Sequence, residues 1–163
     1  MILVFAEHQK GQFKKAAFET VFYGHKTAEA LGTECVALVL GEAENLEELG
    51  KYGASRVYQV SDAGVAQIDS QVYTSVIAQA AEKAGAHTIV LTHSSTGKSL
   101  IGRLAARLNA ASVSGVNSVP EQTGETIKVR KPVFSGKAFA DYELKSEYKV
   151  LSLMGNSFQP AEV

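Results

Sequence analysis

The feature that most constrains the fold is a series of short apolar runs that alternate with amphipathic helical patterns. Residues 2–6 and 35–40 are continuously apolar, as strands are when both faces of a parallel sheet are covered. Between them, from Phe13 to Leu31, apolar and small residues recur at steps of three and four, and Gly32 follows. This pattern is typical of an amphipathic helix that ends at a glycine. The opening residues therefore predict a strand, a helix and a second strand.

The alternation continues to about residue 110. Further strands are expected at residues 56–60 and 87–91, and helices at residues 45–52, 72–84 and 101–108. Parallel strands need crossover connections, which are right-handed and place helices on the faces of the sheet. We therefore predict an α/β fold, a parallel sheet with helices on both faces.

The last third of the chain has a different pattern. Two β-prone segments, residues 127–134 and 137–144, flank a Ser-Gly pair at 135–136 and predict a tight hairpin. Pro132 should lie at an edge or a bulge, because it has no backbone N–H to donate. One more strand is expected at residues 148–153. The predicted fold thus carries a C-terminal antiparallel β-hairpin extension.

Length and composition exclude several classes of protein. The chain has 163 residues and a net charge of −1, which suits one self-sufficient domain and argues against nucleic-acid binding. Its single cysteine, Cys35, lies in an apolar run and is expected to be a buried, inert thiol. No apolar stretch reaches membrane-spanning length, so no membrane insertion is expected. The start lacks a basic region, unlike a signal peptide, and we expect a cytoplasmic protein.

Charge is distributed unevenly along the chain. Residues 1–97 carry a net −4 and residues 98–163 a net +3. Ordinary scatter of solvated surface charges accounts for this difference. The alternative is a basic ribbon that meets an acidic partner, formed by Lys128, Arg130, Lys131 and Lys137.

The candidate binding site is the polar segment after the fourth strand. Ligands of open parallel sheets bind beyond the carboxyl ends of the strands, where the strand order reverses. If the first and fourth strands are neighbours, the loops that follow them face each other there. The start of a helix has free backbone N–H groups, and together with small hydroxyl residues and a cation it can bind an anion. The alternative is a structural role, in which one hydroxyl caps the helix and the glycine eases the turn. The candidate residues are Ser94, Ser95, Thr96, Gly97 and Lys98.

No catalytic or metal site can be assembled from the sequence. A P-loop would need glycine at position 92, where the chain has Thr92. No dinucleotide-binding glycine pattern follows the first strand. Glu7, His8 and His93 could meet on two loops around a metal, but they lack ligand spacing, and ordinary loop residues are the better interpretation. We expect no catalytic residues and no metal.

Three segments in register resemble the alpha subunit of electron transfer flavoproteins. They are residues 2–8 (ILVFAEH), 92–105 (THSSTGKSLIGRLA) and 131–138 (KPVFSGKA), and the similarity runs along nearly the whole chain. The resemblance implies a fold of the adenine-nucleotide hydrolase-like type, related to universal stress proteins. One departure lies in the closing strand, residues 150–155 (VLSLMG), which lacks an Arg that is common at its end in the family.

The resemblance also implies a role. The family accepts electrons on FAD from dehydrogenases, often acyl-CoA dehydrogenases, and passes them to a quinone oxidoreductase. The alpha subunit pairs with a beta subunit, which carries AMP in many members. Most FAD contacts come from a second domain of the alpha subunit, whose motifs have no counterpart here, so no flavin-binding residue is carried over. The resemblance thus implies a non-enzymatic N-terminal domain at residues 1–157, with residues 158–163 beginning the linker to an absent FAD-binding domain.

Other expectations stay open beside this one. The hydroxyl-rich segment before a helix also suits a stand-alone, universal-stress-protein-like module that binds nucleotides. Exposed sheet edges and the hairpin can pair with a second copy, which predicts a homodimer of the isolated domain. The compartment implied is the cytoplasm of a bacterium.

Overall fold

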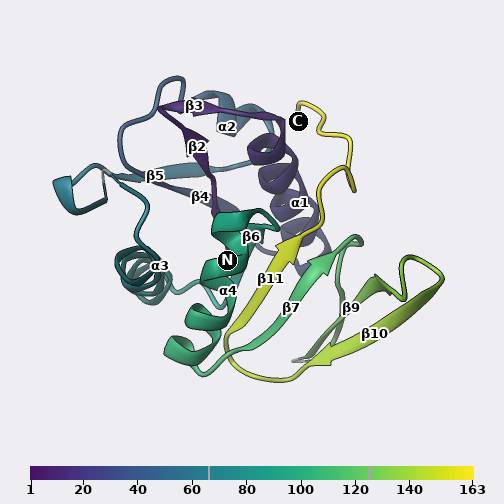
Figure 1. Cartoon of the computed structure of the whole chain (residues 1–163). Helices are drawn as coiled ribbons and strands as arrows, with labels where there is room; N and C mark the ends of the chain where they lie inside the picture. The colour runs from purple at the N-terminus through teal and green to yellow at the C-terminus, as the bar shows by residue number, and fades with distance from the viewer. Residues whose placement is uncertain (66, 125) are drawn as a thin grey trace.

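The centre of the protein is a sheet of six parallel strands in the order β5-β4-β1-β6-β11-β7. A computed structural model describes residues 1–65, 67–124 and 126–163 (Figure 1). The predicted α/β parallel sheet is confirmed. Its strands are β1 (Ile2–Phe5), β4 (Cys35–Leu40), β5 (Arg56–Val60), β6 (Thr88–Thr92), β7 (Ala111–Val116) and β11 (Lys149–Leu153).

Helices cover both faces of this sheet, as predicted. Successive side chains of a strand point to opposite faces, so Ile2 and Val4 join one apolar cluster while Leu3 and Phe5 join the other. The first cluster lies under α1 (Lys15–Leu31) and the short α2 (Glu48–Lys51), and the second under α3 (Ser70–Ala84) and α4 (Ser95–Leu108). A 3-10 turn at Ala63–Val65 precedes α3.

The predicted hairpin is present, within a second sheet of three antiparallel strands. Its order is β10 (Ala138–Leu144), β9 (Thr126–Val133) and β8 (Glu121–Thr123). This sheet is an insertion, because the chain afterwards returns to place β11 between β6 and β7. Pro132 pairs with Phe139 of β10, and the pairing of β8 with β9 stops at Lys128. Pro132 therefore lies where β9 is paired on one side, as expected for a residue without an N–H.

The start of the first helix differs from the prediction. Phe13 belongs to a small antiparallel pair, β2 (His8–Gln9) and β3 (Gln12–Phe13), and α1 begins at Lys15. Lys10 and Gly11 both have positive φ, 51° and 85°, which makes the tight turn between these strands. The ring of Phe13 packs against the apolar cluster under α1. In the sequence, Phe13 therefore looks like one more apolar residue of the helix.

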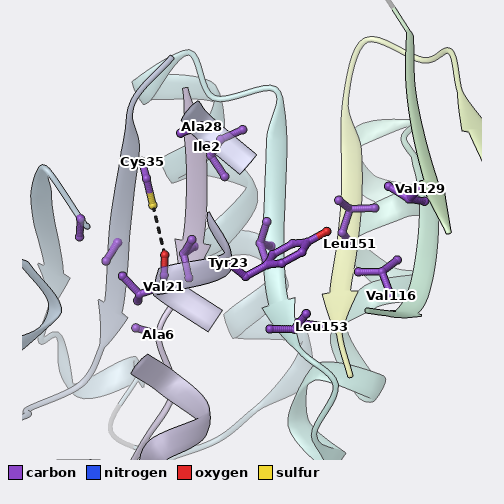
Figure 2. Packing of buried hydrophobic residues seen from close by; sticks show 14 of the residues in the cluster. Ile2, Ala6, Val21, Tyr23, Ala28, Cys35, Val116, Val129, Leu151 and Leu153 are labelled. Carbon is purple, nitrogen blue, oxygen red and sulfur yellow. Dashed lines mark hydrogen bonds between the residues drawn. The ribbon is translucent and has the colours of Figure 1, made fainter. Parts of the chain in front are cut away.

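Helix α1 packs closely on β1 and β4 because a glycine lies at the contact. A Cβ atom added to Gly24 would overlap the Val4 side chain and lie 3.1 Å from the Sγ atom of Cys35. Both neighbours are buried, and Figure 2 shows the apolar cluster on this side of the sheet. Close-packed side chains in such a cluster have no free space into which they can move.

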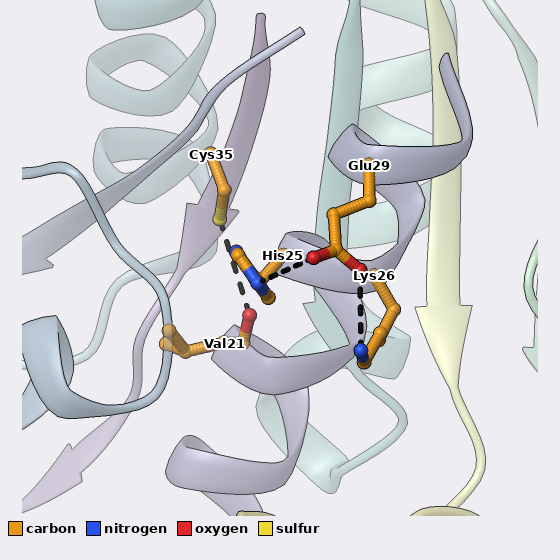
Figure 3. Close-up of polar contacts among 5 residues, drawn as sticks. All are labelled: Val21, His25, Lys26, Glu29 and Cys35. Carbon is orange, nitrogen blue, oxygen red and sulfur yellow. Dashed lines mark hydrogen bonds and ion pairs between the residues drawn. The ribbon is translucent and has the colours of Figure 1, made fainter. Parts of the chain in front are cut away.

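Cys35 is the buried, inert thiol that the sequence predicted. Its Sγ lies 3.9 Å from the backbone oxygen of Val21, and burial raises its pKa to about 12. Figure 3 shows this contact beneath α1, together with Glu29, which is paired with His25 and Lys26 at 3.2 and 3.1 Å. The hydrogen bond from Lys26 lowers the pKa of Glu29. The helix thus has an apolar inner face and a charged outer one.

Gly24→Ala should destabilise the protein although alanine favours helices. In an open helix this change stabilises by about 1 kcal/mol, whereas overpacking a core costs about 1–3 kcal/mol. Gly102→Ala is the matched control, because Gly102 lies in α4 with nothing within 4 Å of an added Cβ. Urea unfolding should show a lower free energy of unfolding for Gly24→Ala and an equal or higher one for Gly102→Ala. Stabilisation by both would contradict the close contact.

Candidate functional site

The loops after β1 and β6 meet at the point where the strand order reverses. β1 has β4 on one side and β6 on the other, so the chain leaves β1 in one direction and later returns to its opposite side. Ser94, just after β6, donates a hydrogen bond from Oγ to the Oε1 atom of Glu7, just after β1, at 2.6 Å. The prediction that these two loops face each other is confirmed.

Ser94 is the N-cap of helix α4. Its Oγ accepts a hydrogen bond from the backbone N–H of Gly97 at 3.0 Å, which satisfies one of the N–H groups that a helix start leaves without a partner. Ser95 to Lys98 therefore form the first turn of α4, whereas the sequence suggested a loop running to Gly97. Of the hydroxyl residues that could have capped the helix, the structure selects Ser94.

Gly97 allows this first turn to lie directly on the end of β6. A Cβ atom at Gly97 would overlap the carbonyl oxygen of Thr92, a backbone atom that cannot move without disturbing the strand. The role of Gly97 seen in the structure is this close approach of helix to strand.

The carboxylate of Glu7 lies at the start of α4, where an external anion would otherwise be favoured. Burial raises the pKa of Glu7 above its ordinary value, and the hydrogen bond from Ser94 opposes part of this rise. The positive end of the helix dipole also favours a negative group beside the N-cap. A carboxyl group of the chain itself thus lies beside the start of α4. Anion binding by Ser94, Ser95, Thr96, Gly97 and Lys98 stays a prediction.

His8 holds the small β2–β3 turn against the sheet. Its Nδ1 accepts from the N–H of Gly11 at 3.0 Å, so its Nε2–H donates to the carbonyl of Leu40 at 2.8 Å. Both ring nitrogens are used within the chain, and a metal would have to displace one of these bonds.

His93 contacts a buried serine that the sequence analysis missed. The Oγ of Ser152 accepts from the N–H of Gly115 at 2.9 Å and lies 3.0 Å from Nδ1 of His93. Burial lowers the pKa of His93, and the charges of Lys98 and Lys131 lower it further. Ser152 interrupts an apolar strand, which is the one sequence signal that could have marked it. This network joins the ends of β6, β7 and β11.

The concave features around these residues are small or open. A cavity of about 20 Å³ beside Glu7 is lined by Phe5, His8 and Tyr73 among others, which is room for about one water molecule. A wider groove of about 1000 Å³ lies nearby and is open to solvent. Within residues 1–65, 67–124 and 126–163, no cluster of three or more His, Cys, Asp or Glu side chains could hold a metal ion.

Comparison with known proteins identifies the family. The profile described as "Electron transfer flavoprotein domain" matches residues 2–163. The chain belongs to this family. The resemblance to the alpha subunit is confirmed by relatives such as the electron transfer flavoprotein subunit alpha of Bacillus subtilis (strain 168), 29% identical over 140 residues, which are 85% of this chain and 42% of that protein.

Two other relatives carry different names and are also matched over less than half of their length. Protein FixB of Clostridium saccharobutylicum is 29% identical over 142 residues, 85% of this chain and 42% of the relative. The lactate dehydrogenase (NAD(+),ferredoxin) subunit LctC of Acetobacterium woodii is 25% identical over 141 residues, 85% of this chain and 34% of the relative. The chain therefore spans less than half the length of these curated relatives.

The described residues do not fit an enclosed flavin site. A flavin dinucleotide needs a deep, shaped pocket and donors for its two phosphates. The cavity at the strand ends holds about one water, the wider groove beside it is open to solvent, and the α4 start already faces Glu7. Every buried side-chain nitrogen or oxygen atom in the described parts of the chain has a hydrogen-bond partner.

In the same parts, no helix has the length and apolar character needed to span a bilayer.

Glu7→Gln should change the pH dependence of stability. A raised pKa means that the folded protein binds the Glu7 proton more tightly than the unfolded chain does. The wild type should therefore lose stability relative to Glu7→Gln as pH rises from about 4.5 through the raised pKa of Glu7. Urea unfolding across this pH range measures the difference.

Glu29→Gln provides a control of opposite sign. The pKa of Glu29 is lowered, chiefly by Lys26, so its contribution is present above the ordinary pKa and is lost as pH falls. Because Glu29 is exposed, solvent screening should make this effect small. Parallel pH profiles for wild type and Glu7→Gln would contradict the raised pKa of Glu7.

Proposed function

We propose that this chain is the N-terminal structural domain of an electron transfer flavoprotein alpha subunit. In this role it supports electron transfer from dehydrogenases, such as acyl-CoA dehydrogenases, to a quinone oxidoreductase, through FAD held mainly by another domain. The observation that carries the proposal is the family match along residues 2–163, which corresponds to less than half of the length of the relatives. The poor fit of the strand ends to a flavin supports the same division of labour. The domain would then have no catalytic residues of its own.

We further propose that the β9–β10 hairpin contacts the beta subunit. Phe134 and Phe139 are 79% and 61% exposed and lie on the same hairpin, and exposed apolar side chains that gather in one patch mark interaction sites. Phe134 has φ 52° and Ser135 φ 56°, the left-handed values of a tight hairpin turn, so Phe134 lies at the tip of the hairpin. Lys131 and Lys137 flank the tip, so the surface suits an acidic patch on the partner.

The double variant Phe134→Asp and Phe139→Asp should weaken binding to a purified beta subunit by at least about tenfold, because exposed aromatic anchors each contribute about 1–2 kcal/mol or more. Ile68→Asp is the matched control, since Ile68 is 65% exposed outside the hairpin. Calorimetric titration measures both. Equal affinities of the hairpin and control variants would contradict the hairpin site, and no binding by the wild type would contradict the partnership.

The isolated 163-residue chain should purify without flavin. After incubation with excess FAD and gel filtration, absorbance in the visible range should be far below one flavin per chain, because most FAD contacts are proposed to lie in another domain. AMP, if it is present in the assembly, is proposed to belong to the beta subunit. Stoichiometric flavin on this chain would overturn the assignment of the FAD site.

A stand-alone nucleotide-binding module has less support. The hydroxyl-bearing start of α4 favours it, but the carboxyl group of Glu7 already lies beside that start. Absence of a thermal shift with millimolar ATP or AMP would remove this alternative.

Sedimentation of the isolated domain would separate a homodimer, paired through its open edges, from a monomer. We place the protein in the bacterial cytoplasm, in keeping with the bacterial relatives named above.

A further inference from the structure

The segment after β11 is bound to helix α1 by a buried carboxylate. Glu19 is only 2% exposed, and its Oε1 accepts hydrogen bonds from the backbone N–H groups of Ser157 and Phe158 at 2.7 and 3.1 Å. Asn156 has φ 60°, and this left-handed residue precedes the two N–H groups that converge on Glu19. Consecutive backbone N–H groups in such a turn form a good site for a carboxylate. Figure 1 shows the yellow C-terminal segment running beside α1.

An aromatic contact adds a second point of attachment. The ring of Phe158 packs against that of Tyr23, one helical turn beyond Glu19, with centroids 5.2 Å apart and planes at 65°. Tyr23 is fully buried and donates from its hydroxyl to the carbonyl of Ser118 at 2.8 Å. Because Tyr23 is held by this bond and by the core, the place of Phe158 is determined as well.

A third attachment lies at α2. The N–H of Val163 donates to the carbonyl of Lys51 at 2.7 Å. The pKa of Lys51 is raised, mainly by Glu48 and in smaller part by the charge of Glu162. The segment is therefore held at residues 157–158 and again at 163, across two helices on one face of the sheet.

We propose that Glu19 is a positioning residue that makes residues 155–163 an ordered strap along α1. Without the two N–H donors, Glu19 would be a buried charge with lost hydrogen bonds, and such a group is costly. The strap and the carboxylate therefore stabilise each other, and the strap belongs to the folded domain. The sequence suggested that residues 158–163 begin a linker.

The consequence for the proposed function concerns any part of the protein that follows residue 163. If the chain is part of an alpha subunit, the following domain is attached at a set place beside α2, and reorientation of that domain requires bending beyond the strap. This consequence rests on the proposed function, whereas the strap itself is tested in the present chain alone.

Hydrogen exchange followed by NMR tests the strap. The amides of Ser157 and Phe158 should be protected in the wild type, and Glu19→Ala should raise their exchange rates by about tenfold or more while amides of β1 and β6 keep their protection. Glu19→Gln retains a carbonyl acceptor and should restore much of the protection. Glu29→Ala, on the exposed side of the same helix (Figure 3), is the control and should leave both amides protected.

Distances between spin labels give an independent test. Labels at Glu47→Cys and Val163→Cys should give one narrow distance in the wild-type background and a broad distribution with Glu19→Ala, while the buried Cys35 stays unlabelled. Unprotected amides at 157 and 158 in the wild type would overturn the proposal. Equal loss of protection in the strap and in the sheet of Glu19→Ala would also overturn it, because Glu19 would then serve general stability. None of these results depends on the beta subunit or on flavin.

Discussion

The close contact of helix α1 with β1 and β4 is the interaction on which the rest of the structure depends. Gly24 lets the helix approach until Val4 and Cys35 fill the space that a side chain would occupy. With the helix at this depth, Thr20 Oγ lies 2.7 Å from Thr92 Oγ at the end of β6, and Tyr23 reaches the carbonyl of Ser118. A helix held farther away would lose these bonds together, since buried hydrogen bonds tolerate little displacement.

This position of α1 also connects the candidate site with the C-terminal segment. Thr92 is the residue whose carbonyl oxygen lies against Gly97 at the start of α4, and α4 is capped by Ser94, which in turn contacts Glu7. Next to Thr20 on α1, Glu19 binds the segment after β11. The carboxyl ends of the strands are thus occupied by the chain's own polar groups.

Much of the fold could be predicted because its signals are local. Apolar runs such as residues 35–40 have no polar side chain to expose, so they require a sheet covered on both faces. The predicted start of α1 was wrong, because Phe13 packs on the same cluster as the helix and extends its periodic pattern. Likewise, the loop before α4 was predicted too long, since several hydroxyl residues in a row are all suitable caps and their order does not say which one is used.

The order of residues along the chain is enough to predict a parallel α/β sheet with an added hairpin and a buried Cys35. These follow from the pattern of apolar and polar residues, which depends only on which faces avoid water. The tertiary structure decided that Glu7 faces Ser94, that Ser152 holds Gly115 beside His93, and that Glu19 binds the backbone of Ser157 and Phe158. Glu19 is separated from its partners by more than a hundred residues, and a carboxylate that is buried by such distant groups looks in the sequence like any charge on the side of an amphipathic helix.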